Sequence, residues 1–341
     1  MLVKEKNNKT STKYAILLFR NNNKKGGTIM LKSNDDYNTS VYFFEDFILL
    51  IFVLIDDLYQ QYVPVSVKKR RNIEKAKLSD TECITIAICG ELLGIDSEKS
   101  WYSFVKRNYS QLFPKMCSRS RFNRTCRNLL QVTELLMEKL SECIDFTQSS
   151  YRIVDSFPLP VCKFGRARYA KAFRMDGATY GKCPSKKETY YGYKVHVMTT
   201  LEGFITQFEV TPANVDDRPP VFDLTDGIEN IIILGDKGYT GKEFCRQLFI
   251  ENKIMYALKR SGNQEDVPAF IRRLIFKNRR RIETTFSQLT EQLNAENVLA
   301  KSLCGLCTRL LHKILGYNLC IVVNYIFNIT LNISQIKQLI F

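Results

Sequence analysis

The sequence predicts an α/β fold in which a mixed sheet flanked by helices is preceded by an all-α domain. The first observation is Ile231–Leu234, four apolar residues in a row that indicate a strand buried on both faces, as in a mostly parallel sheet. The second is the alternating pattern of residues 189–200 and 204–210, which indicates two strands joined by a turn at Glu202-Gly203. The third is the chain before residue 149, whose apolar stretches indicate helices.

The charge of the chain points to a polyanionic partner. The protein has 341 residues, a net charge of +15 and a pI near 9.2. An excess of this size favours nucleic acid, here double-stranded DNA. A membrane surface is the competing partner. It is disfavoured because the longest apolar run, Phe47–Ile55, is closed by acids on both sides and is shorter than the about 20 residues that span a bilayer.

The cysteines and the amino terminus bear on the cellular compartment. The chain has eleven cysteines, an odd number, in apolar contexts such as Cys83 and Cys320, which indicates reduced thiols in a cytoplasmic protein. Residues 1–40 are expected to be disordered, or to follow a start codon assigned too far upstream, with Met30 as the alternative start. Their apolar patch is too short for a secretory signal.

Residues 41–148 are predicted to form a helical domain. Ser79-Asp-Thr-Glu82 has the pattern of a helix cap, with acids in the first turn of the next helix. The expected order is a helix over Val41–Tyr62, a basic linker at Lys68–Arg71, a helix over Cys83–Leu93 ended by Gly94, and a further helix from Ser97.

Four arginines open the last helix of this domain. The segment Cys117–Arg127 leads into an apolar stretch over Leu129–Ile144, and the short helices before it resemble a helix-turn-helix arrangement. Arginine and serine at such a helix start suit phosphates and base edges. The alternative is a plain helical bundle with a solvated basic face. The candidate DNA-binding residues here are Arg119, Arg121, Arg124 and Arg127.

A strand and a basic loop come next. Arg152–Phe157 is predicted to be a strand that carries Asp155 near its end, and Pro158 and Pro160 are expected to break the regular structure after Phe157. Residues 161–188 are predicted to be a loop in which basic residues alternate with aromatics, as a DNA groove would need. A solvated insertion is the other interpretation. The basic residues of this loop are Arg166, Arg168, Lys171, Arg174, Lys182, Lys186 and Lys187.

Two more acids occupy matching places further along. Asp236 comes directly after the buried strand, at the carboxyl edge where open α/β sheets place their chemistry, although Asp also often starts an ordinary loop. After a helix over Lys242–Ile250, a strand over Ile254–Leu258 and a mobile segment at Ser261–Asp266, a long helix is predicted over Phe270–Asn297. Glu283 lies on that helix, where the plain interpretation is a salt bridge with Arg279.

Three acids that meet from two strands and a helix would form a site for hard divalent cations. Carboxylate oxygens are the ligands that Mg²⁺ prefers, and Mn²⁺ is able to substitute. Two ions about 4 Å apart can activate a water or a 3′-hydroxyl and stabilise the leaving oxygen of a phosphodiester. The predicted ligands and catalytic residues are Asp155, Asp236 and Glu283.

The blocks around these acids resemble those of a DDE insertion-sequence transposase, specifically the insertion sequence 982 family. The blocks are Ile-Val-Asp155-Ser, Tyr191-Gly-Tyr-Lys-Val-His196, Gly-Asp236-Lys-Gly-Tyr and Arg-Arg-Arg-Ile-Glu283-Thr-Thr-Phe. The resemblance covers roughly residues 40–330. It implies a ribonuclease-H-like core, Mg²⁺ dependence, the three acids as the catalytic triad, and cutting and rejoining of DNA at the ends of the protein's own element.

One position departs from the pattern of related insertion sequences. They often have a Lys seven residues after the Glu, where this chain has Thr290. The corresponding DNA contact is then expected from Arg279 or Arg280, and Lys237 is counted with the DNA-binding residues. The expected division is a DNA-binding domain over 41–148, a catalytic core over 149–300 and a helical tail over 301–341.

Other chemistries have less support. Cys304 and Cys307 with His312 begin like a zinc site, but position 317 is Tyr and the surrounding leucines describe a packed helix. His196 lies inside a predicted strand, where a core role is more common than a catalytic one. The competing functions are a structure-selective nuclease and an inert DNA-binding regulator. A homodimer on DNA in a bacterial cytoplasm is expected, because two element ends must be brought together.

Overall fold

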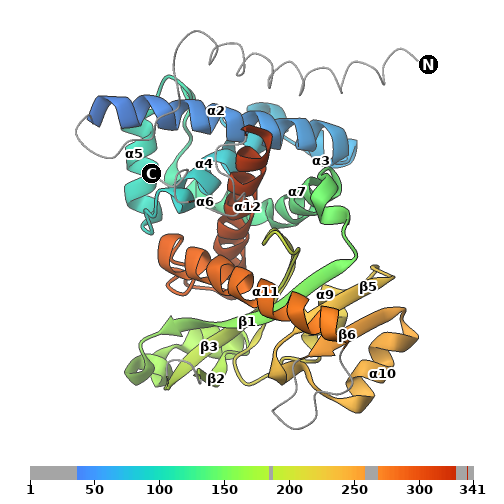
Figure 1. The fold of residues 1–341 in the computed structure, drawn as a ribbon. Helices are drawn as coiled ribbons and strands as arrows, with labels where there is room; N and C mark the ends of the chain where they lie inside the picture. The colour runs from blue at the N-terminus through green and yellow to red at the C-terminus, as the bar shows by residue number, and fades with distance from the viewer. Residues whose placement is uncertain (1–36, 184–186, 258–267, 328–335, 337–341) are drawn as a thin grey trace. The chain divides into compact units, whose positions relative to one another are not determined.

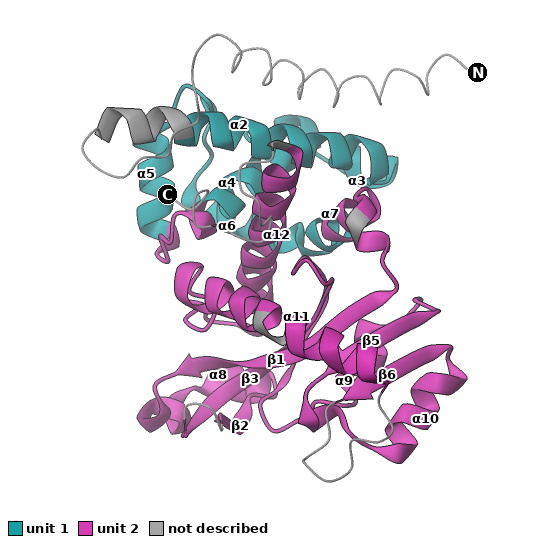
Figure 2. Cartoon of the chain, in the orientation of Figure 1, with its two compact units in different colours: residues 1–89, 99–136, 341 teal, residues 90–98, 137–340 magenta. Residues whose placement is uncertain are grey.

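The protein is described by a computed structural model, which covers residues 37–183, 187–257, 268–327 and 336 (Figure 1). The expectations of disorder over most of residues 1–40 and of mobility at Ser261–Asp266 fall outside the described residues, as does Lys186. The chain divides into two compact units: residues 1–89, 99–136 and 341 in unit 1, and residues 90–98 and 137–340 in unit 2 (Figure 2).

Unit 1 is helical, as the sequence predicts. The capping pattern before its second long helix is confirmed: the Ser79 N–H donates to Glu82 Oε2 at 2.6 Å, and the Glu82 N–H donates to Ser79 Oγ at 3.0 Å. Its elements are α2 (Tyr37–Tyr62), α3 (Val65–Lys68), η1 (Ile73–Lys75), α4 (Asp80–Leu92), α5 (Glu98–Asn108), α6 (Arg119–Asn128) and α7 (Leu130–Glu142), with the ends of α4 and α7 and the start of α5 assigned partly to unit 2.

The arginine-rich segment forms a short helix of its own. Ser118 caps α6 by accepting a hydrogen bond from the Arg121 N–H at 3.3 Å, and Leu129 then separates α6 from α7. One face of α6 is buried through Phe122 and Cys126, whereas Arg119, Arg121 and Arg124 are exposed and Arg127 is half-buried. The helix therefore presents its basic residues outward.

Unit 2 contains a six-stranded mixed sheet, which agrees with the predicted α/β class. β1 runs antiparallel to β3 and parallel to β5, and β5 runs parallel to β6, so β5 is central as predicted. The order is β2-β3-β1-β5-β6, with β4 paired to β3. The strands are β1 (Tyr151–Cys162), β2 (Thr179–Cys183), β3 (Glu188–Thr199), β4 (Ile205–Pro212), β5 (Ile231–Gly235) and β6 (Lys253–Ala257).

The prediction that two prolines end the first strand is wrong. β1 continues through Pro158 and Pro160, which lie opposite Lys194 and Gly192 of β3. β5 pairs with β1 over residues 151–153, so at the prolines β1 pairs only with β3 among the described strands. Proline is tolerated at such a position because its missing N–H removes no ladder bond on the open side.

Two other predicted segments of unit 2 differ from the structure. The predicted loop over 161–188 contains a turn of 3₁₀ helix, a short helix and strand β2. The predicted helix over 270–297 is shorter: it ends at Ser287, continues as a π-helical turn to Gln292, and Asn294 then takes a positive φ of 50°. The remaining elements of unit 2 are η2 (Asp145–Gln148), η3 (Phe164–Tyr169), α8 (Lys171–Met175), α9 (Pro220–Leu224), η4 (Lys237–Tyr239), α10 (Lys242–Ile250), α11 (Ala269–Ser287), η5 (Gln288–Gln292) and α12 (Leu303–Phe327).

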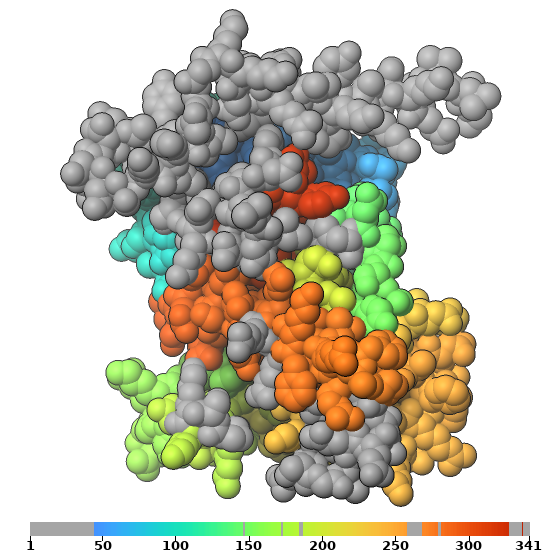
Figure 3. Space-filling view, in the orientation of Figure 1, coloured from blue at the N-terminus to red at the C-terminus, as the bar shows by residue number. Residues whose placement is uncertain are grey.

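Alternation along the strands divides the core into two layers. Ile231 and Ile233 face α9 and α10, where they pack with Val221, Phe244 and Leu248. Ile153 and Leu234 face α11, where they pack with Ile271, Ile275 and Ile282. Figure 1 shows α11 crossing the strands on that side, and Figure 3 shows its outer surface as an orange band. The sheet is therefore covered on both faces, which explains why β5 is apolar throughout.

Helix α12 is long and apolar enough to cross a membrane by length and composition, but 94% of its most apolar stretch is buried inside the protein. Leu306, Leu310 and Ile314 have no exposed surface, as expected for the packed helix that the sequence predicts. The zinc pattern on this helix does not assemble: Cys304 is exposed, His312 is buried, and no group of His, Cys, Asp or Glu suited to a metal occurs among the described residues.

Candidate functional site

The alternation of β1 and β5 determines where the first two acids point. Asp155 comes two residues after Ile153, and Asp236 comes two residues after Leu234, so each acid continues the face that packs against α11. α11 itself carries Glu283, next to the buried Ile282. Two strands and a helix thus direct three carboxylates toward the same side of the sheet.

The three acids border one cavity of about 180 Å³. Parallel strands β1 and β5 form its floor, and α11 forms its wall. In the described part of the chain, no group of three or more His, Cys, Asp or Glu is close enough together to hold a metal ion as it stands. The carboxylates share a cavity without forming a closed ligand cluster. The lining residues are Ile153, Val154, Asp155, Leu234, Gly235, Asp236, Lys237, Ile275, Asn278, Ile282 and Glu283.

Backbone amides hold two of these carboxylates. The Ser156 N–H donates to Asp155 Oδ1 at 2.8 Å, and the Gly238 N–H donates to Asp236 Oδ1 at 2.7 Å, which caps η4. Gly235 allows Met255 and Tyr239 to pack against the backbone before Asp236, because a β-carbon there would lie 2.5 Å from Met255 Cε and 2.8 Å from Tyr239 Cδ2. Asp236 is consequently aimed by its own turn.

Tyr239 lies under this turn. Its side chain is buried, and burial raises the pKa of its phenol well above the usual value, with the charges of Asp155, Asp217 and Asp236 adding to the effect in that order. The phenol therefore stays neutral at pH 7 and supports the turn by packing.

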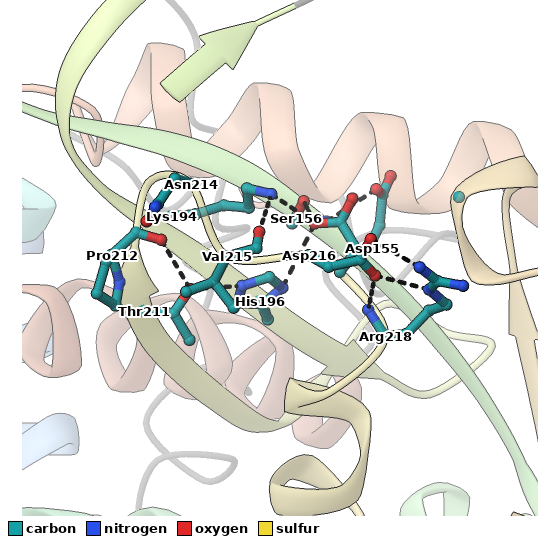
Figure 4. Close-up of polar contacts among 12 residues, drawn as sticks. Asp155, Ser156, Lys194, His196, Thr211, Pro212, Asn214, Val215, Asp216 and Arg218 are labelled. Atoms are coloured by element: carbon teal, nitrogen blue, oxygen red, sulfur yellow. Dashed lines mark hydrogen bonds and ion pairs between the residues drawn. The ribbon is translucent and has the colours of Figure 1, made fainter. Parts of the chain in front are cut away.

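A second polar network lies on the other face of β1 (Figure 4). Asp217 Oδ1 accepts hydrogen bonds from Ser156 Oγ at 3.0 Å and from Lys194 Nζ at 2.9 Å. His196 lies directly opposite Ser156 in the register of β1 and β3, and its Nδ1 is 3.7 Å from Asp217 Oδ1. The neighbouring Asp216 pairs with Arg218 at 2.7 Å.

His196 is a core residue, as the commoner interpretation of the sequence holds. Its side chain is 1% exposed, and its Nε2 shares a hydrogen bond with Thr211 Oγ1 at 2.8 Å. Burial lowers the pKa of His196 to about 4, against the opposing charge of Asp217, so the ring is neutral at pH 7. The enclosed ring is hydrogen-bonded to Thr211 and has no surface that a substrate could reach, which gives no support to histidine-led nucleophilic catalysis.

Of the three basic residues predicted to contact DNA near the cavity, the structure describes the side chain of Lys237. Lys237 is exposed and lines the cavity beside Asp236. Arg279 and Arg280 lie on α11, but their side chains are outside the described residues, so the predicted pair between Arg279 and Glu283 is not tested. Thr290, at the position where a lysine was expected, donates its hydroxyl to the Phe286 carbonyl at 2.8 Å.

The other predicted DNA-binding residues lie on exposed surfaces of their own units. On α6 of unit 1, Arg119, Arg121 and Arg124 are exposed and Arg127 is half-buried. In unit 2, Arg166, Arg168 and Lys187 are exposed. Exposed aromatic rings lie in the same part of unit 2: Tyr180 is 51% exposed and touches Phe164 at 5.7 Å between ring centroids, and Arg168 lies over Tyr169 at 5.3 Å.

Sequence reasoning missed the Asp217 network. Lys194 and His196 lie on one face of β3 and belong to one of the motif blocks, but Asp217 is 23 residues from Lys194 and 61 from Ser156 along the chain. Only the register of β1 against β3 brings these residues together. Asn278, buried at the wall of the cavity, was also missed because a helical Asn carries no distinctive signal.

Comparison with known proteins now assigns the domain. Residues 146–302 match the family model described as "Transposase DDE domain". These residues include all three cavity acids. Residues 146–302 are therefore similar to transposase DDE domains. DDE transposases use divalent metal ions, which suits a cavity bordered by carboxylates.

Two further comparisons are less informative. Among solved structures, the chain is similar to one described as the cryo-EM structure of a piggyBac transposase synaptic complex with hairpin DNA, at 14% identity and a TM-score of 0.32. The match covers 72% of this chain, which spans 55% of the length of that transposase. No curated protein matches the chain.

Proposed function

We propose that the protein is a DNA transposase that binds the ends of its own insertion element, cuts them and joins them to target DNA. The observation that carries the proposal is the shared cavity: Asp155, Asp236 and Glu283, from three distant segments, border one space. That space lies inside the segment that matches the DDE domain. The proposal includes a ribonuclease-H-like catalytic core and membership of the insertion sequence 982 family, which the motif blocks support.

The donor set fits hard divalent cations. Three carboxylates offer only oxygen ligands, and a cavity of about 180 Å³ leaves room for ions with water. When bound, Mg²⁺ or Mn²⁺ would activate a water or the 3′-hydroxyl of the DNA and would stabilise the leaving oxygen.

The residues around the cavity orient the metal ligands, contact the DNA and limit the access of water. Asp155 and Asp236 are held by backbone amides, so their remaining oxygen lone pairs are directed by the fold before DNA arrives. Glu283 approaches from the helix wall. Lys237 places a positive charge at the rim, where it contacts a phosphate oxygen of the strand to be cut. Leu234 and Ile275 keep the inner wall apolar and limit bulk water.

Double-stranded DNA is the proposed partner. The net charge of +15 favours it, and residues 163–183 carry six basic residues against one acid around exposed aromatic rings. In unit 1 the outward arginines of α6 suit the start of a recognition helix in a helix-turn-helix domain. A homodimer that pairs two ends, in the cytoplasm of a bacterium and associated with its nucleoid, completes the proposal.

The test is an incubation of the full chain with DNA that contains the flanks of its gene, with and without Mg²⁺, followed by mapping of the ends. We expect Mg²⁺-dependent 3′-hydroxyl ends at the element boundaries and joined products. Asp236→Asn, which keeps an oxygen acceptor for Gly238, should abolish both and leave DNA binding intact. Asp226→Asn, at an exposed acid outside the cavity, is the matched control.

Two outcomes would replace the proposal. Cleavage without joined products would indicate a structure-selective nuclease that uses the same acids. DNA binding without any Mg²⁺-dependent cleavage would indicate an inert DNA-binding regulator derived from a transposase. Thr290 in place of the expected lysine is the observation that favours the second alternative.

A further inference from the structure

Asp217 holds β1 at the residue beside Asp155. Ser156 donates its hydroxyl to Asp217 Oδ1 at 3.0 Å. Side chains alternate along a strand, so Ser156 and Asp155 point to opposite faces of the sheet. Asp217 therefore acts from behind β1 and does not line the cavity.

The other oxygen of Asp217 faces the turn that carries Asp236. A β-carbon placed on Gly238 would lie 3.0 Å from Asp236 Oδ1 and 3.6 Å from Asp217 Oδ2. Both carboxylates thus border one glycine, whose N–H caps Asp236. Asp217 is inserted between the strand that carries one cavity acid and the turn that carries the other.

A half-buried lysine and a buried histidine of β3 help to fix the position of Asp217. Lys194 Nζ donates to Asp217 Oδ1 at 2.9 Å and to the Val215 carbonyl at 2.8 Å. His196, which is 1% exposed, directs a nitrogen with no hydrogen-bond partner in the structure toward the same oxygen, 3.7 Å away. Three neighbours from β1 and β3 therefore leave Asp217 little rotational freedom.

We propose that Asp217 is a positioning residue that fixes the spacing between Asp155 and Asp236, so that these two carboxylates can share divalent cations. The inference rests on the proposed function, because it assigns a role toward ions that the cavity acids would bind. Residues that orient metal ligands without touching the ion commonly change metal affinity about 10–100-fold when they are replaced.

The test measures Mn²⁺ binding to the full chain by titration calorimetry and by electron paramagnetic resonance, without DNA and without turnover. Asp217→Asn should weaken binding by about tenfold. Asp226→Asn removes the same charge from an exposed acid after α9 and should leave the affinity unchanged. Equal affinities for the two variants would overturn the inference.

Lys194→Met separates positioning from simple charge. If Asp217 only added negative field near the cavity, removal of its lysine partner would strengthen Mn²⁺ binding. If Asp217 positions the two ligands, loss of the lysine frees it and weakens Mn²⁺ binding by about tenfold. A purely structural role predicts a lower melting temperature with unchanged affinity. Tighter or unchanged binding would therefore contradict the inference.

Ser156→Ala provides a milder variant if Asp217→Asn fails to fold. It removes one hydrogen bond and no charge, and it should weaken Mn²⁺ binding about fivefold. Failure of the proposed function would look different: the wild-type chain would then show no Mn²⁺ site that Asp155→Asn removes. Failure of the inference alone would leave that site in place and insensitive to changes at Asp217 and Ser156.

Discussion

Unit 2 uses carboxylates in two contrasting environments. Glu91 is buried and pairs with Arg309 at 2.7 Å and with Lys313 at 2.5 Å. The cavity acids are exposed or half-buried and share a space with one lysine at its rim. Burial alone would raise the pKa of Glu91, but the charges and hydrogen bonds of Lys313 and Arg309 together lower it.

The difference separates structural from functional acids. Two cations satisfy the charge of Glu91 within the fold, so that cluster has no need of a ligand. The cavity acids are directed by backbone amides toward an open space, where an external cation can approach. Replacement of an acid should therefore damage stability at one site and activity at the other.

The largest expected effect is on activity at the cavity. Asp155→Asn should reduce DNA cleavage by at least about 1000-fold, equivalent to about 4 kcal/mol of barrier, because a ligand of the cations is lost. The free energy of unfolding should be unchanged or slightly higher, since one of three neighbouring negative charges is removed. Cleavage assays and urea denaturation of the same preparation measure both. Residual cleavage within about tenfold of wild type would contradict the role of Asp155.

The second effect is on stability at the closed cluster. Glu91→Gln should lower the free energy of unfolding by about 3–5 kcal/mol, because it leaves Arg309 and the fully buried Lys313 without their carboxylate. Urea denaturation measures the loss. Preparations that remain folded should retain Mn²⁺ binding. A loss of stability below about 1 kcal/mol would show that the cluster is less closed than the structure indicates.

Each environment also contains a buried histidine, and these two histidines should make the free energy of unfolding depend on pH. Burial lowers the pKa of His196, behind the cavity near Asp217 and Lys194, to about 4, and that of His312, near Glu91 and Arg309, to about 4. The unfolded chain takes up these protons first, near a pH of about 6.5. Stability is therefore fully present above about pH 6.5 and is lost as pH falls toward 4, by up to about 3 kcal/mol per histidine.

Denaturation curves between about pH 7 and pH 4.5 measure this effect. His196→Gln and His312→Gln should each remove part of the slope, and the double variant should flatten it most, because the chain has two histidines. A slope that persists in the double variant would assign the pH dependence to carboxylates instead. Mn²⁺ binding should respond to His196→Gln more than to His312→Gln, since only His196 lies next to Asp217.

The sequence predicts which segments form the strands of the sheet better than it predicts where those strands end. The apolar run before Asp236 and the hairpin at Gly203 result from local pattern, and the structure confirms β5 and the β3–β4 pair. The extension of β1 through Pro158 and Pro160 was not predictable, because proline is excluded or tolerated according to which edge is paired. That pairing is a property of the whole sheet.

The three cavity acids can be predicted from the sequence, but the residue that we propose positions them cannot. Asp155, Asp236 and Glu283 are each marked by a local pattern and a motif block, so they could be selected without a structure. Asp217 has no local signal, since an aspartate in a turn is common. Its importance arises from Ser156 and Lys194, which the strand register brings to it. Sequence reasoning finds ligands more readily than the residues that hold them.

The central claim is that Asp155, Asp236 and Glu283 share divalent cations. Crystals grown with Mn²⁺ and measured at the manganese absorption edge test it most directly. We expect anomalous density in the cavity between β1, β5 and α11, within about 2.2 Å of carboxylate oxygens of all three acids. Manganese that binds elsewhere, or that contacts none of these carboxylates at saturating concentration, would contradict it.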